Sequence, residues 1–120
     1  MGVDIRLYIG IKHEDFKIKE KYCYFEDIVS YEFCVDYNLV KLIEQQKETN
    51  CLITIEDQDF TKDYYGKTLK EIPIETLIEY LENDTEDYRR IKPLLYMLKG
   101  FKEESEKGNY DNLIVIPFLH

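Results

Sequence analysis

The chain has 120 residues, of which 44% are hydrophobic and 34% are charged. With 11 tyrosines and 6 phenylalanines, this composition is typical of a domain that folds rather than of a disordered chain. Sixteen basic and 25 acidic side chains give a formal net charge of −9, which disfavours direct binding to nucleic acid and to anionic lipid. No apolar run is long enough to cross a bilayer. We therefore expect one soluble domain over residues 1–120 that makes no membrane contact.

The cysteines and the first residues indicate a reducing compartment. Cys23, Cys34 and Cys51 are odd in number and include no C-x-x-C pair, which fits neither a closed disulfide framework nor a zinc ribbon. We expect reduced thiols in the core. The first residues carry no basic segment followed by an apolar one, so the sequence predicts a cytoplasmic protein.

The first third of the chain favours strands. Val3, Ile5, Leu7, Ile9 and Ile11 alternate with other residues, which predicts a strand over 3–11 with one buried face and one wet face. The polar segment 12–15 then predicts a turn, and 16–24 a second strand in a hairpin with the first. Segment 25–35 fits a strand or a short helix; its β-branched and aromatic content favours the strand.

The middle of the chain indicates a helix followed by a strand. Leu39, Leu42 and Ile43 recur at helical spacing after a capping Asp36 or Asn38, and Asn50 is a plausible left-handed terminator. Segment 51–55 then predicts a short strand, and the two elements suggest a crossover unit against the first sheet. We interpret 56–72 as a loop with a short extended piece at 67–71.

The last third predicts two helices and a buried strand. One helix starts at Pro73 and carries an apolar stripe from Ile74 to Leu81. The next opens near Asp84 or Thr85, must kink or restart at Pro93, and closes at Gly108. The apolar run 113–119 is typical of a strand covered on both faces. Together these elements predict an α+β fold: a single domain whose mixed or antiparallel sheet of about four to five strands packs against two to three helices.

Known catalytic and metal-binding patterns are incomplete in this chain. The triplet Gly66 to Thr68 resembles the end of a phosphate-binding loop, but Thr61 stands where that loop needs glycine. The pair His13 and Glu14 resembles the start of the zinc-binding helix of metalloproteases, yet Lys17 stands where that motif has its second histidine. Segment 57–59 resembles the start of a calcium loop that lacks its glycine at the sixth position. The sequence therefore predicts no enzyme, no metal site and no cofactor.

One candidate binding site is an acidic stripe on the first C-terminal helix. Three glutamates lie at spacings i, i+4 and i+7 and so share one helix face. Three further acids follow in the first turn of the next helix, where negative charge is favoured. These residues are either a solvated face with a capped junction or a surface for a basic partner. The set is Glu75, Glu79, Glu82, Asp84, Glu86 and Asp87.

A second candidate site is the loop after residue 55, which mixes carboxylates with tyrosines. Tyrosine offers a large contact area with a polar tip at a low entropic cost, and it is favoured at protein interfaces. The alternative is that the two tyrosines only cover the sheet. The predicted partner-binding residues of this loop are Glu56, Asp57, Asp59, Asp63, Tyr64 and Tyr65.

Two functions follow from these features. The first is an interaction protein that inhibits a basic partner, such as a nuclease toxin or a nucleic-acid-guided effector, by charge-complementary surface blocking. In size, acidity and tyrosine content the chain resembles toxin-immunity proteins and phage anti-defence proteins, a likeness of composition and not of motif. The alternative is a small-molecule or nucleotide binder that uses aromatic rings for stacking and Arg6, Arg89 or Arg90 for phosphate. A homo-oligomer could concentrate those arginines.

Overall fold

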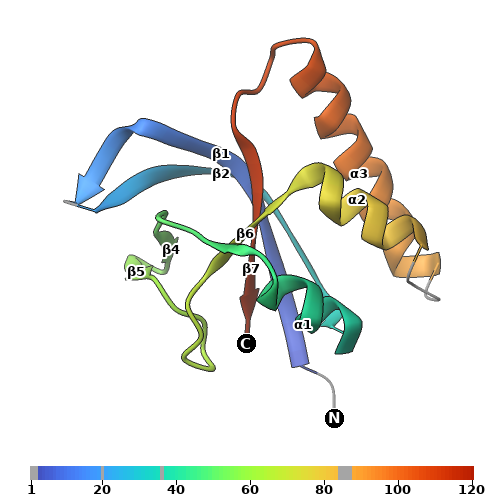
Figure 1. Cartoon of the computed structure of the whole chain (residues 1–120), viewed down its shortest axis with the longest axis horizontal. Helices are drawn as coiled ribbons and strands as arrows, with labels where there is room; N and C mark the ends of the chain where they lie inside the picture. The colour runs from blue at the N-terminus through green and yellow to red at the C-terminus, as the bar shows by residue number, and fades with distance from the viewer. Residues whose placement is uncertain (1–2, 20, 36, 84–87) are drawn as a thin grey trace.

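Two long antiparallel strands, β1 (Val3–Lys19) and β2 (Tyr22–Val35), form one side of the main sheet (Figure 1). The computed structural model describes residues 3–19, 21–35, 37–83 and 88–120, with the side chains of all of these except 3, 16–19, 33–35 and 88–90. The main sheet has the strand order β2-β1-β7-β6-β3 and every pairing in it is antiparallel. The predicted α+β fold is confirmed.

Strand β1 continues through the segment that we expected to be a turn. Residues 12–15 are polar, but among them Asp15 alone is of a residue type that favours chain reversal. The chain reverses only between Lys19 and Tyr22, which face each other in the register. The predicted turn at 12–15 and the separate second strand over 16–24 are therefore wrong, whereas the strand expected over 25–35 is confirmed as part of β2.

A β-bulge interrupts the β1–β2 pairing at Gly10. Ile9 pairs with Val29 but Gly10 pairs with Asp27, so β2 has one extra residue, Ile28, at this point. A Cβ atom on Gly10 would lie 2.0 Å from the carbonyl oxygen of Glu26. Glycine is thus required here because the partner backbone approaches too closely for any side chain.

Strand β7 (Leu113–Leu119) is the central strand, as its apolar run predicted (Figure 1). It pairs with β1, where Ile5 lies opposite Leu119, and with β6 (Lys70–Pro73). Its side chains alternate between two hydrophobic clusters: Val115 and Leu119 belong to one, Ile116 and Phe118 to the other. The sheet is therefore covered on both faces.

Three helices cover one face of the sheet. They are α1 (Tyr37–Glu44), α2 (Ile74–Asn83) and α3 (Tyr88–Glu106), and their apolar residues form one cluster with Ile5, Leu7 and Ile9 of β1. None of the helices in the described part of the chain is both long and apolar enough to cross a bilayer.

The helix boundaries differ from the predicted ones in three places. α1 ends at Glu44, and Asn50 is not among the residues with left-handed backbone. Pro73 is the last residue of β6 and directly precedes α2. α3 runs through Pro93 without a restart, although this proline lacks the amide that would donate to the carbonyl of residue 89. The left-handed Gly108, with φ of 87°, follows the end of α3 as expected.

A small hairpin covers the other face. β4 (Ile53–Ile55) pairs with β5 (Gln58–Phe60) in a separate two-stranded sheet, so the predicted crossover against the first sheet is wrong. The hairpin packs with Phe118, Ile116 and Tyr8. Tyr8 is consequently only 5% exposed, although alternation along β1 placed it on the wet face. The short β3 (Lys47–Glu48) pairs with β6 at the far edge of the main sheet.

Candidate functional site

The predicted acidic stripe lies on α2, with all three of its glutamates exposed. Each of them either pairs with a lysine of another element or lines a pocket that such a lysine also lines. Glu82 is 3.4 Å from Lys99 of α3. Glu79 shares a groove with Lys41 of α1, and Glu75 lines a pocket of about 400 Å³ together with Lys47 and Lys102. The negative charge of Glu82 is therefore partly compensated by an ion pair within the protein.

The other three acids of this first candidate site, Asp84, Glu86 and Asp87, lie outside the described residues. Their expected place in the first turn of α3 stays a prediction. The first site is thus represented in the structure by the α2 glutamates alone.

The second candidate site begins at the tight turn between β4 and β5. Ile55 pairs with Gln58, which leaves a two-residue turn of Glu56 and Asp57. Both residues have left-handed backbone, with φ of 49° and 65°. This geometry matches a type I′ turn, which normally selects Asn and Gly. The fold therefore holds two exposed acids at a position that disfavours them sterically.

Asp63 is buried and has a structural role in this loop. It is 8% exposed, and its Oδ1 accepts hydrogen bonds from the backbone amides of Tyr65 at 2.9 Å and Lys67 at 3.0 Å. The amide of Gly66 donates to the Asp63 carbonyl at 3.1 Å. Asp63 thus fixes the loop and contributes little to an exposed acidic surface, although the sequence predicted it among the partner-binding residues.

Tyr64 and Tyr65 are exposed on this fixed loop. Their exposed fractions are 63% and 56%. The Tyr64 ring packs edge-on against Phe118, with ring centres 5.1 Å apart, and against Phe60. The Tyr64 amide also donates to the carbonyl of Leu119 at the end of β7. Both tyrosines are therefore largely exposed to solvent, although Tyr64 also packs on the end of the sheet.

The structure separates the two candidate sites. The apolar side of α2 packs in the cluster that contains Val115 and Leu119 of β7. The β4–β5 hairpin packs in the cluster that contains Ile116 and Phe118, on the opposite face of the same strand. Figure 1 shows α2 and the hairpin on different sides of the sheet. They cannot form one continuous binding surface.

We define the tyrosine loop surface as the exposed members of the second site. Asp59 belongs to it as well: it is exposed and accepts a hydrogen bond from the Thr54 hydroxyl at 2.7 Å. The tyrosine loop surface consists of Glu56, Asp57, Asp59, Tyr64 and Tyr65.

The group of Arg6, Glu32 and His120, which lies beside Tyr64, was not predicted. Arg6 Nη2 lies 3.4 Å from both carboxylate oxygens of Glu32, and the His120 ring contacts the same carboxylate and the edge of Tyr64. With Tyr8 and Phe118, Arg6 and His120 line a pocket of about 180 Å³. Arg6 lies on β1, Glu32 lies on β2 and His120 directly follows β7, so only the strand order brings the three together.

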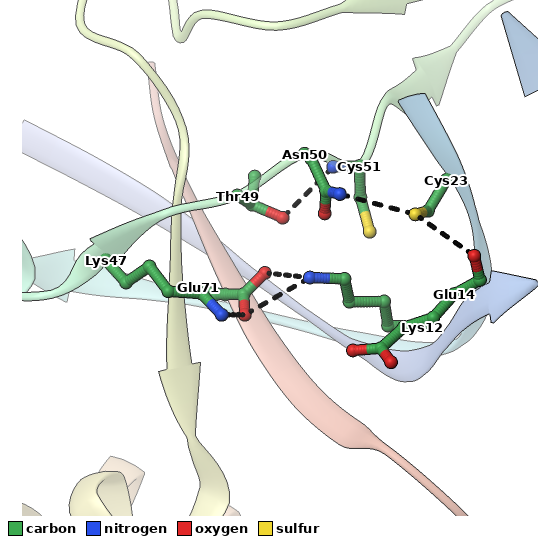
Figure 2. Close-up of polar contacts among 8 residues, drawn as sticks. All are labelled: Lys12, Glu14, Cys23, Lys47, Thr49, Asn50, Cys51 and Glu71. Atoms are coloured by element: carbon green, nitrogen blue, oxygen red, sulfur yellow. Dashed lines mark hydrogen bonds and ion pairs between the residues drawn. The ribbon is translucent and has the colours of Figure 1, made fainter. Parts of the chain in front are cut away.

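A buried ion pair forms a second group that sequence reasoning missed (Figure 2). Lys12 Nζ lies 3.2 Å from Glu71 Oε2, and both residues are less than a tenth exposed. Lys47 reaches the other carboxylate oxygen at 3.1 Å. Burial alone would raise the pKa of Glu71, but hydrogen bonds from Thr49, Lys47 and Lys12 outweigh it and lower that pKa. The sequence placed Lys12 in a turn and Glu71 in a loop, which concealed the pair.

The thiols of Cys23 and Cys51 are free and buried, as the sequence predicted. The two residues face each other in a short parallel bridge next to the ion pair. Burial raises the pKa of Cys51, which disfavours the reactive thiolate. The side chain of Cys34 lies outside the described part.

Comparison of the chain with models of protein families, with curated proteins and with solved structures gives no match.

Proposed function

We propose that this protein is a small acidic intracellular interaction protein that inhibits a basic protein partner by covering it with the tyrosine loop surface. The partner class is a nuclease toxin or a nucleic-acid-guided effector, since both expose basic surfaces to polyanionic substrates. The observation that carries the proposal is the buried Asp63 carboxylate, which holds the loop of two exposed tyrosines in a fixed shape.

A fixed loop with exposed aromatic rings suits tight protein binding. Ordering a flexible loop on association costs free energy, so a loop that is already ordered retains more of its contact energy. Tyrosines near the centre of an interface are frequent hot spots. The Tyr64 ring is also held in place, because it packs against Phe118 and Phe60.

Charge supports the same proposal. The net charge of −9 creates a long-range field that attracts a basic protein and speeds its capture. Glu56, Asp57 and Asp59 place acids directly beside the tyrosines. A bound partner would lose access to its own polyanionic substrate, which explains inhibition without any chemical step. The acidic stripe on α2, where Glu82 already pairs with Lys99, is a weaker candidate for this role.

Site-specific cross-linking tests the proposal. A benzophenone side chain in place of Tyr64 should capture a basic protein, whereas the same group in place of Tyr96 should not. Tyr96 is a matched control because it is 65% exposed but lies on α3, in the helix layer. Capture should weaken in salt and with the double substitution Glu56→Lys and Asp57→Lys. The purified partner should regain nuclease activity when Tyr64→Ala and Tyr65→Ala replace the wild-type chain. Equal capture at both positions would exclude the tyrosine loop surface.

Binding of a small ligand is a second candidate function, favoured by the pocket that joins Arg6 to Tyr64 and Phe118. The pocket of about 180 Å³ is smaller than the 300–1,000 Å³ typical of ligand sites. Arg6 is moreover already paired with Glu32. A thermal-shift panel of nucleotides tests this alternative: a rise in melting temperature that Arg6→Ala abolishes would favour it over the inhibitor.

A further inference from the structure

Strand β2 is an edge strand of the main sheet. It has β1 on one side, and on its other side the described residues provide one bridge, between Cys23 and Cys51. There the Cys23 amide donates to the carbonyl of Asn50 at 2.8 Å. This bridge shows that the outer edge of β2 accepts an extended segment at one end. No strand of the described part continues that pairing along residues 25–30.

Exposed edge strands attract further strands unless side chains prevent it. Here the edge carries a bulge at Ile28 and the exposed acids Glu26, Asp27 and Glu32. A second copy of the chain would pair poorly with this edge of β2. An antiparallel twofold pairing centred on Val29 would place Glu26 of one copy opposite Glu32 of the other, and like charges directly opposite are destabilising.

The three acids differ in their pairing within the protein. Glu26 Oε1 lies 2.9 Å from His13 Nε2, and Glu32 contacts Arg6 and His120. Asp27 forms no ion pair with another of the described residues, and partial burial raises its pKa. A cation brought next to Asp27 would remove the cost of that partly desolvated charge.

We propose that residues 25–30 of β2 bind an extended segment of another protein that carries lysine or arginine, with one basic side chain at Asp27. The segment adds a strand to the sheet, so backbone hydrogen bonds give affinity and Asp27 selects its charge. The proposal goes beyond the proposed function, because the contact is a strand edge and not the tyrosine loop surface.

A synthetic nine-residue peptide of alternating lysine and threonine tests this edge, with binding measured by NMR titration at low salt. Amide hydrogen exchange within residues 25–30 should slow on binding. Two control peptides separate the contributions: one has glutamate in place of lysine, and the other is N-methylated at alternate residues and so keeps its charge but loses hydrogen-bond donors. We expect no binding of the first and a loss of affinity of about tenfold or more for the second.

Variants of the protein complete the test. Asp27→Asn should weaken binding of the lysine peptide about tenfold, whereas Asp111→Asn, which removes one exposed acid elsewhere, should change it less than twofold. Tyr65→Ala should leave the affinity unchanged. The inference is overturned if the N-methylated peptide binds equally well, if no peptide binds, or if protection appears outside residues 25–30. Loss of peptide binding in Tyr65→Ala would overturn it too, yet leave the tyrosine loop surface as a binding site.

Discussion

Lys12 Nζ and Glu71 Oε2 lie 3.2 Å apart in the interior, although β7 separates their two strands in the sheet. Removing one partner of a buried pair leaves the other charged and unpaired, which costs about 3–5 kcal/mol. We therefore expect Glu71→Gln to reduce the free energy of unfolding by about this amount, as measured by urea denaturation. Lys12→Met should cost less, because Lys47 still pairs with Glu71.

An exposed pair provides the control for that prediction. Lys67 Nζ lies 2.9 Å from Glu44 Oε1, with both side chains more than half exposed. Glu44→Gln should change the free energy of unfolding far less than Glu71→Gln does, because water screens an exposed pair. The double variant Lys12→Met and Glu71→Met should recover much of the stability lost in Glu71→Gln. Equal effects of Glu71→Gln and Glu44→Gln would contradict the assigned role of the buried pair.

The same carboxylate predicts a pH dependence. The pKa of Glu71 is lower in the folded protein than its ordinary value of 4.5. At a pH between these two pKa values, the unfolded chain therefore binds more protons than the folded protein. The stabilisation is therefore complete above pH 4.5 and is lost as the pH falls through the lowered pKa. The free energy of unfolding, measured from pH 7 to pH 3, should fall less steeply with acid in Glu71→Gln. An identical slope in both proteins would argue against this linkage.

Asp27 predicts a pH dependence of stability with the opposite sign. Its pKa is raised above its ordinary value of 3.8 by partial burial, so the folded protein binds the extra proton. Ionisation of Asp27 then lowers stability as the pH rises from the ordinary pKa to the raised one. Asp27→Asn should unfold at a higher temperature than the wild type at pH 7, with the difference vanishing near pH 3. A lower melting temperature at pH 7 would show that the carboxylate has a stabilising partner.

Two glycines provide a matched pair of opposite expectations. A Cβ on Gly10 meets the Glu26 carbonyl oxygen at 2.0 Å, whereas a Cβ on Gly100 in α3 meets nothing within 4 Å. Gly10→Ala should destabilise the protein by about 3 kcal/mol or more, because backbone has to move. Gly100→Ala should stabilise it by up to about 1 kcal/mol through helix propensity. Thermal unfolding of both variants checks the prediction, and a tolerated Gly10→Ala would mean that the bulge can relax.

The turn of Glu56 and Asp57 predicts a conflict between stability and binding. Glu56→Asn with Asp57→Gly supplies the residues that a type I′ turn favours, and the pair should stabilise the protein by about 1 kcal/mol. The same change removes two acids from the tyrosine loop surface, so capture of a basic partner should weaken. Melting temperature and cross-linking yield, measured on one preparation, test both effects. A destabilised variant would contradict the turn geometry.

Elements whose burial shows in a regular pattern could be predicted from sequence. The apolar run 113–119 identified β7 as central, and the alternation from Ile5 to Ile9 identified β1. The α2 helix was found because its apolar stripe is clear. Residues 12–15 were misjudged because polarity alone does not show whether a neighbouring strand supplies hydrogen bonds, and the partner of the buried Lys12 is Glu71, 59 residues away in the sequence.

The candidate site was predictable in composition but not in arrangement. The sequence identified Tyr64 and Tyr65 as candidate contact residues, with covering of the sheet as the alternative, and both are exposed. It grouped Asp63 with them because a local pattern cannot show that a carboxylate binds two backbone amides of its own loop. The cluster of Arg6, Glu32 and His120 depends on strand order, which no short-range pattern records.

The central position of β7 has a consequence for how the chain folds during synthesis. The β1–β2 hairpin can form as soon as its residues leave the ribosome, but the strand that pairs with the inner edge of β1 is translated only after α3. Until then the apolar side chains of β1 have no sheet partner on that edge. Closing a contact over so long a stretch of chain is slow, so we expect the pairing of β7 with β1 to form late in folding.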